Sequence, residues 1–114
     1  MKERKPLVIL GEKIKSPPFS VEARLEAGVL LGMLQVGLSI SMPHARTMPS
    51  VGKRCLELRI KDEQAEWRIV CRVDSDLILL IHVFSKKTEK TPKSVIELCK
   101  QRLKRYDSLI GGDR

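Results

Sequence analysis

Leu77-Ile78-Leu79-Leu80-Ile81-His82-Val83-Phe84 is the most apolar strand-like run of the chain. Successive residues of a strand point to opposite faces, so this run is apolar on both of its faces. Such a strand belongs in the middle of a sheet that is covered on both sides. His82 is the exception in the run, and it fits a hydrogen-bonded core histidine as well as a reactive group.

Three further strands are predicted upstream. Cys55–Ile60 alternates apolar with charged side chains, and Trp67–Val73 alternates again, with two arginines on one face. Polar residues 61–66 separate these two strands, and the turn 74–76 leads into the apolar run. Leu7–Leu10 is a short strand candidate, whereas the stretch between residues 38 and 53 reads as a long loop.

Two helices complete the pattern. Ser20 is placed to cap the first helix, and Thr91 and Pro92 are placed to begin the second as cap and first residue. The face of the first helix that follows helical spacing comprises Val21, Leu25, Gly28, Val29, Gly32 and Val36. Glycine lowers the stability of a helix by about 1 kcal/mol relative to alanine. We expect close packing against a neighbouring element to compensate for this loss at Gly28 and Gly32.

This order of elements predicts an α+β fold, a small antiparallel-rich sheet backed by helices, with a helix at the C-terminus. The 114 residues suit a single domain, which we assign to residues 1–110, with 111–114 as a flexible tail. No run approaches the ~20 apolar residues of a membrane span, and the apolar piece near the N-terminus is too short for a signal peptide. We therefore expect a cytoplasmic protein.

The three cysteines stand far apart and lack metal-binding spacing. They predict buried free thiols in a reducing compartment and no metal site. We also expect no cofactor.

Strand registers follow from the shortest turns. If residues 61 and 66 pair, Arg59 lies opposite Arg68; if residues 73 and 77 pair, Arg68 lies opposite His82 and Arg72 opposite Ile78. Both registers place five side chains on one sheet face, namely Glu57, Arg59, Arg68, Arg72 and His82. Two directly opposed arginines cost stability unless an anion sits between them, so this face is expected to bind one. A structural ion pair of Arg59 with Glu57 on an uncovered sheet face is the alternative.

The segment from Phe84 to Pro92 crowds lysines between the apolar strand and the second helix. Residues 84–105 carry eight lysines and arginines against two glutamates, which gives 8 − 2 = +6 of the chain's net charge of +8. Lysines ahead of a helix N-terminus attract anions, and phosphate is the expected one. The residues assigned to phosphate binding are Lys90, Arg72, Arg46 and Lys93. A solvated surface is the alternative for the helix lysines.

Three motifs together resemble the RelE/ParE toxin superfamily, and more narrowly its phage-derived, HigB-like branch. They are the Glu57-Leu58-Arg59 strand, the Trp67-Arg68 strand and Phe84-Ser85-Lys86-Lys87-Thr88-Glu89-Lys90-Thr91-Pro92 before a basic helix. The resemblance covers roughly residues 48–106, about half of the chain. It implies the compact RelE-like toxin fold, with helices on one face of the sheet and a concave basic surface on the other.

The resemblance also implies a function. Such proteins are toxins of type II toxin–antitoxin systems, encoded beside an antitoxin with a helix-turn-helix domain, and the HigB-like members cut mRNA, generally on the ribosome. Metal-free cleavage needs a base for the 2′-hydroxyl, an acid for the leaving 5′-oxygen and cations at the phosphate. The expectation is that Arg59 and Arg68 clamp the phosphate and Lys86 or Lys87 moves a proton. His82 or Glu57 is the reserve base.

Two other functions stay open at this point. A toxin of the ParE kind would poison gyrase on the same fold, and would need no phosphate-cleaving residues. A non-catalytic nucleic-acid or protein-binding module, including a decayed prophage toxin, would bind in a strongly salt-dependent way and leave RNA intact.

Overall fold

The computed structural model describes residues 3–63, 65–86 and 90–111. Its elements are β1 (Leu7–Ile9), α1 (Val21–Gln35), β2 (Ala45–Thr47), β3 (Cys55–Lys61), β4 (Glu66–Val73), β5 (Ile78–Lys86) and α2 (Lys93–Leu109). The strands form one sheet in the order β1-β5-β4-β3-β2, in which β1 runs parallel to β5 and the other pairs are antiparallel. The α+β class and the C-terminal helix are confirmed. The stretch expected as a long loop contains the short edge strand β2.

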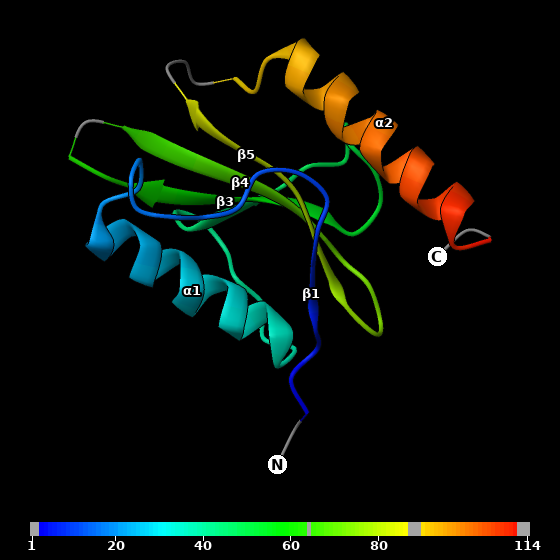
Figure 1. The fold of residues 1–114 in the computed structure, drawn as a ribbon, viewed down its shortest axis with the longest axis horizontal. Coiled ribbons are helices and arrows are strands. Elements are labelled where there is room, and N and C mark those ends of the chain that lie inside the picture. Colours follow the sequence, from blue (N-terminus) through cyan, green and yellow to red (C-terminus); the bar gives the residue numbers. More distant parts are fainter. Residues whose placement is uncertain (1–2, 64, 87–89, 112–114) are drawn as a thin grey trace.

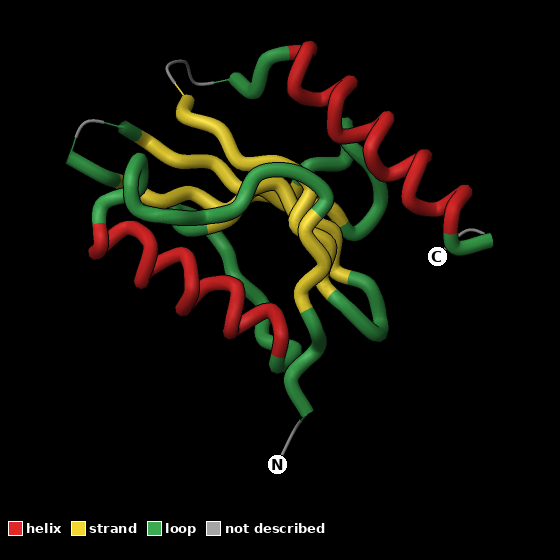
Figure 2. The backbone as a smooth tube through the Cα atoms, viewed as in Figure 1, coloured by secondary structure: helices red, strands yellow, loops and turns green. Residues whose placement is uncertain are grey.

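The two helices cover opposite faces of the sheet (Figure 1). Ile78 and Leu80 of β5 pack in one apolar cluster with the buried side of α1, whereas Leu79 and Ile81 pack in a second cluster with α2. In Figure 2 the strands lie between the two helices. The central position of β5, covered on both sides, is therefore confirmed. The expectation of helices on one face only is wrong, because an apolar strand of this kind needs cover on both faces.

The β3–β4 register is as predicted, with Arg59 directly opposite Arg68. The β4–β5 register is not, because Arg68 lies opposite Phe84 and His82 lies opposite Val70. Two features of β5 displace the pairing. The turn is one residue longer than expected, closed by a 2.9 Å hydrogen bond from the Asp74 amide to the Leu77 carbonyl, and a bulge follows at 70/71.

The longer turn and the bulge together displace β5 by two residues at His82. Because side chains alternate between faces with a period of two, His82 stays on the predicted face. His82 stacks on Phe84, which belongs to the α2-side cluster. Near the turn the shift is only one residue, so Arg72 lies opposite Leu79 and not Ile78. The five polar residues predicted for one face do share it, and that face is the one that α2 covers.

Ser20 caps α1 as predicted, because its Oγ accepts a 3.0 Å hydrogen bond from the Ala23 amide. The predicted packing face of α1 is wrong. The residues that pack on the sheet are Ala23, Ala27, Leu30, Leu31 and Leu34, whereas Leu25 and Val29 are 61% and 62% exposed. The helix carries two apolar stripes, and the stripe with alanines lies closer to the sheet.

Gly28 has open space where a neighbour was expected, since a Cβ atom there would meet nothing within 4 Å. We predict that Gly28→Ala raises the free energy of unfolding by about 1 kcal/mol, because alanine is the better helix former and no atom obstructs it. Urea denaturation measures the change. Gly11→Ala is the contrasting variant, because its Cβ would collide with the Arg102 side chain and approach the Ile81 carbonyl oxygen to 3.0 Å. A Gly28→Ala protein less stable than wild type would contradict this description of α1.

The three cysteines are free and buried, as predicted. Burial raises the pKa of Cys55 to about 11, which makes its thiol a poor nucleophile. In the described part of the chain, neither helix has the length and apolar composition that crossing a bilayer requires. The same residues contain no group of three or more side chains able to hold a metal ion.

Candidate functional site

A buried carboxylate lies between the two opposed arginines of the central sheet. Glu57 is fully buried on β3, and its Oε1 lies 3.4 Å from Nε of Arg68 and 3.7 Å from Nε of Arg59. The cost of placing two guanidinium groups opposite each other is therefore offset within the protein by Glu57. The residue pattern alone had left two sources of that compensation open, a bound anion and an ion pair of Arg59 with Glu57.

The guanidinium groups of Arg59 and Arg68 nevertheless keep hydrogen-bond donors that the described residues do not use. Their Nε atoms are buried, and neither makes a hydrogen bond within the described residues. The Arg68 side chain is only 5% exposed, and its Nη contacts among the described residues are the Trp67 carbonyl at 3.5 Å and the half-exposed carboxylate of Glu66 at 3.6 Å. Such donors suit an oxyanion, because a guanidinium can bind two oxygens of a phosphate at once.

Thr91 connects this cluster to α2. Its Oγ1 donates a 2.6 Å hydrogen bond to Oε2 of Glu57. The predicted role of Thr91 as a helix cap is wrong, since Pro92 occupies the cap position without a side-chain hydrogen bond and the helix begins at Lys93. The beginning of α2 is thus held against the charged row of the sheet. No acidic residue lies in its first turn, so the helix dipole there is not offset by a local carboxylate.

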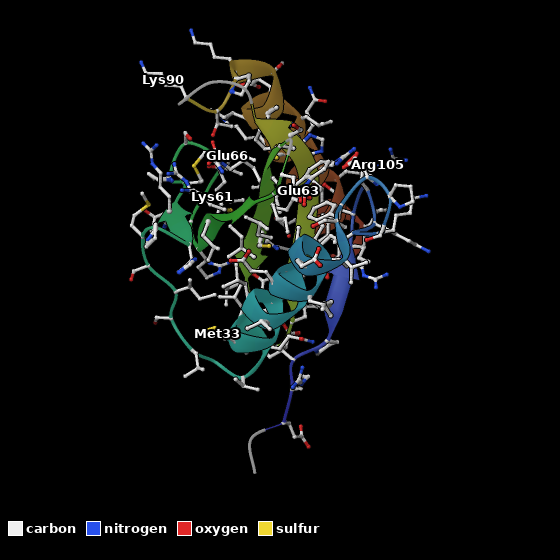
Figure 3. The ribbon with its side chains drawn as sticks, turned by 90° about the vertical axis from the view of Figure 1, so that its left-hand side faces the viewer. Met33, Lys61, Glu63, Glu66, Lys90 and Arg105 are labelled. Carbon is white, nitrogen blue, oxygen red and sulfur yellow. The ribbon has the colours of Figure 1, made fainter. Side chains whose placement is uncertain are left out.

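The predicted lysines lie at the same end of the sheet. β5 ends at Lys86, two residues beyond Phe84, which lies opposite Arg68. Lys90 and Lys93 are exposed, and Figure 3 shows Lys90 near the top of the molecule, above Glu66 and Lys61. Lys87 lies outside the described residues. The structure therefore brings the backbone at Lys86 close to the arginine row.

Arg46 lies on the other side of the cluster. It is exposed on the edge strand β2 and is paired with Glu57 across the sheet. Opposed residues of an antiparallel pair share a face, so Arg46 borders the same charged row.

His82 belongs to a different cluster. Its Nδ1 lies 2.8 Å from Oε1 of Glu12 and 3.2 Å from Nη1 of Arg102, which also donates a 2.7 Å hydrogen bond to the Ile81 carbonyl. Burial alone would raise the pKa of Glu12, but hydrogen bonds from Arg102 and from the backbone outweigh it and lower that pKa to about 2. Through these contacts the chain before α1, strand β5 and helix α2 meet at His82.

Arg72 is the centre of a second ion-pair network. It makes bonds of 2.9 Å and 3.1 Å to Asp74 and of 3.0 Å and 2.8 Å to Asp107 of α2. The two carboxylates accept four hydrogen bonds from the guanidinium, and Arg72 is 5% exposed. Its donors therefore join β4 to α2, and we propose no phosphate contact for it.

Asp107 and Glu12 were not singled out by sequence reasoning. The signal available for Glu12 was Arg102, which helical spacing placed on the apolar face of the second helix. A cation on such a face needs a buried partner. Asp107 offered no comparable signal, because it stands near the end of a helix rich in charged residues.

Asp107 predicts an acid-sensitive contribution to stability. The hydrogen bonds from Arg72 lower the pKa of Asp107, so its stabilisation is present above about pH 3.9 and is lost as pH falls through the lowered pKa of the folded state. We expect Asp107→Asn to lose about 1.5–3 kcal/mol at pH 7. The difference from wild type should shrink towards pH 3, as denaturation at a series of pH values would measure. An equal loss at both pH values would contradict a charged Asp107.

Residues 18–104 match the model of a family described as phage-derived protein Gp49-like (DUF891). No curated protein matches the chain.

Proposed function

Because the chain belongs to the phage-derived Gp49-like family, which is related to the toxins of toxin–antitoxin systems, we propose that it is a type II toxin that cleaves mRNA. In this proposal it is an endoribonuclease of the HigB-like kind, needs no metal ion, and acts in the cytoplasm on mRNA held by translating ribosomes. Its antitoxin is a neighbouring protein with a helix-turn-helix domain.

The observation that carries this proposal is the Arg59–Arg68 pair. The two guanidinium groups lie opposite each other on adjacent strands, and their buried Nε atoms make no hydrogen bond within the described residues. Glu57 lies between the two guanidinium groups, and the half-exposed Glu66 lies 3.6 Å from Arg68. One phosphodiester group would add a negative charge and accept hydrogen bonds from the terminal Nη donors.

The proposed reaction uses the 2′-hydroxyl of the RNA as nucleophile. The hydroxyl attacks the adjacent phosphorus, the bond to the 5′-oxygen breaks, and the products are a 2′,3′-cyclic phosphate and a 5′-hydroxyl end. Arg59 and Arg68 bind the phosphoryl oxygens, on which negative charge builds in the transition state. Such preorganised donors typically contribute factors of about 10²–10³ to the rate.

A lysine from the segment after β5 is proposed to move the proton. Lys86 ends the strand at the arginine row, and Lys87 follows it directly. One of them protonates the leaving oxygen while water takes up the hydroxyl proton; if neighbouring cations depress its pKa, the lysine accepts the hydroxyl proton and water supplies the proton for the leaving oxygen. Lys90, Lys93 and Arg46 are proposed to bind phosphates on either side of the cleaved bond, at positions that border the site.

The proposal is tested with purified protein on three substrates: mRNA on translating ribosomes, the same mRNA alone, and supercoiled DNA with gyrase. We expect ribosome-bound mRNA to be cut to 5′-hydroxyl and cyclic phosphate ends, and gyrase activity to be unchanged. Inhibited supercoiling with intact mRNA would replace the proposal with a gyrase-directed toxin. Salt-dependent RNA binding without cleavage would indicate a non-catalytic binding module.

A further inference from the structure

Glu57 contacts three separate parts of the fold. It is a fully buried carboxylate on β3, it lies beside Arg59 of its own strand and Arg68 of β4, and it accepts a hydrogen bond from Thr91 before α2. A charge placed in a protein interior is costly unless charged and hydrogen-bonding partners surround it. For Glu57 these are two guanidinium groups near Oε1, at ion-pair distance without a hydrogen bond, and the Thr91 hydroxyl, which donates to Oε2.

Glu57 approaches each guanidinium group at one edge. Its Oε1 lies near the Nε atoms of Arg59 and Arg68, at 3.7 Å and 3.4 Å. The terminal Nη atoms lie beyond Nε and form the outer fork of the guanidinium, which can bind two phosphate oxygens. The carboxylate can therefore fix the orientation of both arginines and still leave their outer donors to a substrate.

Complete burial also separates Glu57 from the substrate. A general base must come within about 2.6–3.2 Å of the proton that it accepts, and the fully buried Glu57 presents no surface to a 2′-hydroxyl. Its Oε2 is already bonded to Thr91 at 2.6 Å. Burial thus argues against the reserve-base role considered for Glu57. It favours a role in which Glu57 acts through its neighbours.

We infer, on the basis of the proposed RNA cleavage, that Glu57 is the positioning residue of the phosphate site. It holds Arg59 and Arg68 in the geometry that grips the phosphate, and through Thr91 it fixes the beginning of α2, next to the lysines, against those arginines. Neither task requires Glu57 to touch the RNA.

This role predicts opposite effects on binding and on cleavage. Glu57→Gln raises the net charge by one, so RNA binding should be as tight as in wild type or tighter. The rate constant kcat should nevertheless fall by about 10- to 100-fold, because arginines displaced by about 1 Å lose transition-state contacts. KM should stay within about twofold of wild type or decrease. A merely structural residue would lower the apparent kcat only by lowering the fraction of folded protein, which thermal denaturation detects.

The experiment compares Glu57→Gln with Glu97→Gln, which makes the same change of charge on an exposed residue of α2. kcat and KM are measured on ribosome-bound synthetic mRNA, and folding is measured by thermal denaturation. The Nε–H signals of Arg59 and Arg68 are recorded by ¹H–¹⁵N NMR in the absence of RNA, and they are assigned with Arg→Lys variants. Thr91→Val, which removes only the hydroxyl bond, should lower kcat by about 3- to 10-fold and is decisive if Glu57→Gln does not fold.

The inference is supported if kcat falls without a rise in KM and the two Nε–H signals shift or broaden in Glu57→Gln but not in Glu97→Gln. Unchanged Nε–H signals, or a kcat within twofold of wild type, would overturn it. Failure of the proposed function looks different, because Arg68→Lys would then cleave as well as wild type, or wild type itself would leave mRNA intact. The NMR comparison decides whether Glu57 positions the arginines in either case.

Discussion

Arg68→Ala is expected to abolish growth arrest and to lower mRNA cleavage by at least about 100-fold. Arg68 has a side chain that is only 5% exposed, it lies opposite Arg59, and its Nε makes no hydrogen bond within the described residues. Removing it deletes half of the proposed phosphate clamp. Arg68→Lys should also fail, because a point charge cannot grip two phosphate oxygens in one plane.

The control for this prediction is Arg24→Ala. Arg24 is exposed on α1, on the opposite side of the sheet from the arginine pair, and its removal changes the net charge by the same amount. It should cleave mRNA like wild type. Plating after induction and cleavage of ribosome-bound mRNA provide the two readouts, and circular dichroism confirms folding. Wild-type cleavage by a folded Arg68→Ala protein would remove this site.

Arg72→Leu is expected to have the largest effect on stability, a loss of about 3–5 kcal/mol in the free energy of unfolding. Arg72 bonds to both Asp74 and Asp107, so its loss removes the cation that these two carboxylates share. Asp74 is buried, and leaving buried charge without its main cation is costly.

Urea denaturation at pH 7 measures this loss. Arg72→Lys should fall between wild type and Arg72→Leu, because an ammonium group cannot bind the two carboxylates as the guanidinium fork does. A change below about 1 kcal/mol in Arg72→Leu would show that the network contributes little to stability.

The fold class and the β3–β4 hairpin could be predicted from the sequence because their signals are local. Alternating side chains define each strand, and the short polar turn between them favours a register that keeps the apolar side chains of both strands on one face. The central place of β5 followed equally directly from its two apolar faces. The hairpin carries the arginine pair, so the opposition of Arg59 and Arg68 follows from residue types and turn length.

The β4–β5 register, the packing face of α1 and the position of α2 depended on contacts between distant parts of the chain. The bulge near His82 has no glycine or proline to mark it, so the β4–β5 register could not be read from residue types. α1 has two apolar stripes, and only the shape of the sheet decides between them. Helical spacing alone could not predict that α2 covers the charged face, because its docking also depends on the shape of the sheet.

The candidate site was accordingly predicted in part. Residue types and register placed Arg59, Arg68 and Glu57 together, but the burial of Glu57 and its bond to Thr91 depend on where α2 docks. Arg72 and His82 share the predicted face. Each is engaged by carboxylates from other segments, at Asp107 and Glu12, which local patterns do not reveal.

Mapping the 5′ ends of cellular RNA after induction tests the central claim most directly. Wild-type protein should produce new 5′-hydroxyl ends within translated coding regions, and the same ends should be absent after equal induction of Arg68→Ala. Growth arrest with intact mRNA, or the same ends in both strains, would contradict the assignment of Arg59 and Arg68 as the phosphate clamp of an mRNA-cleaving toxin.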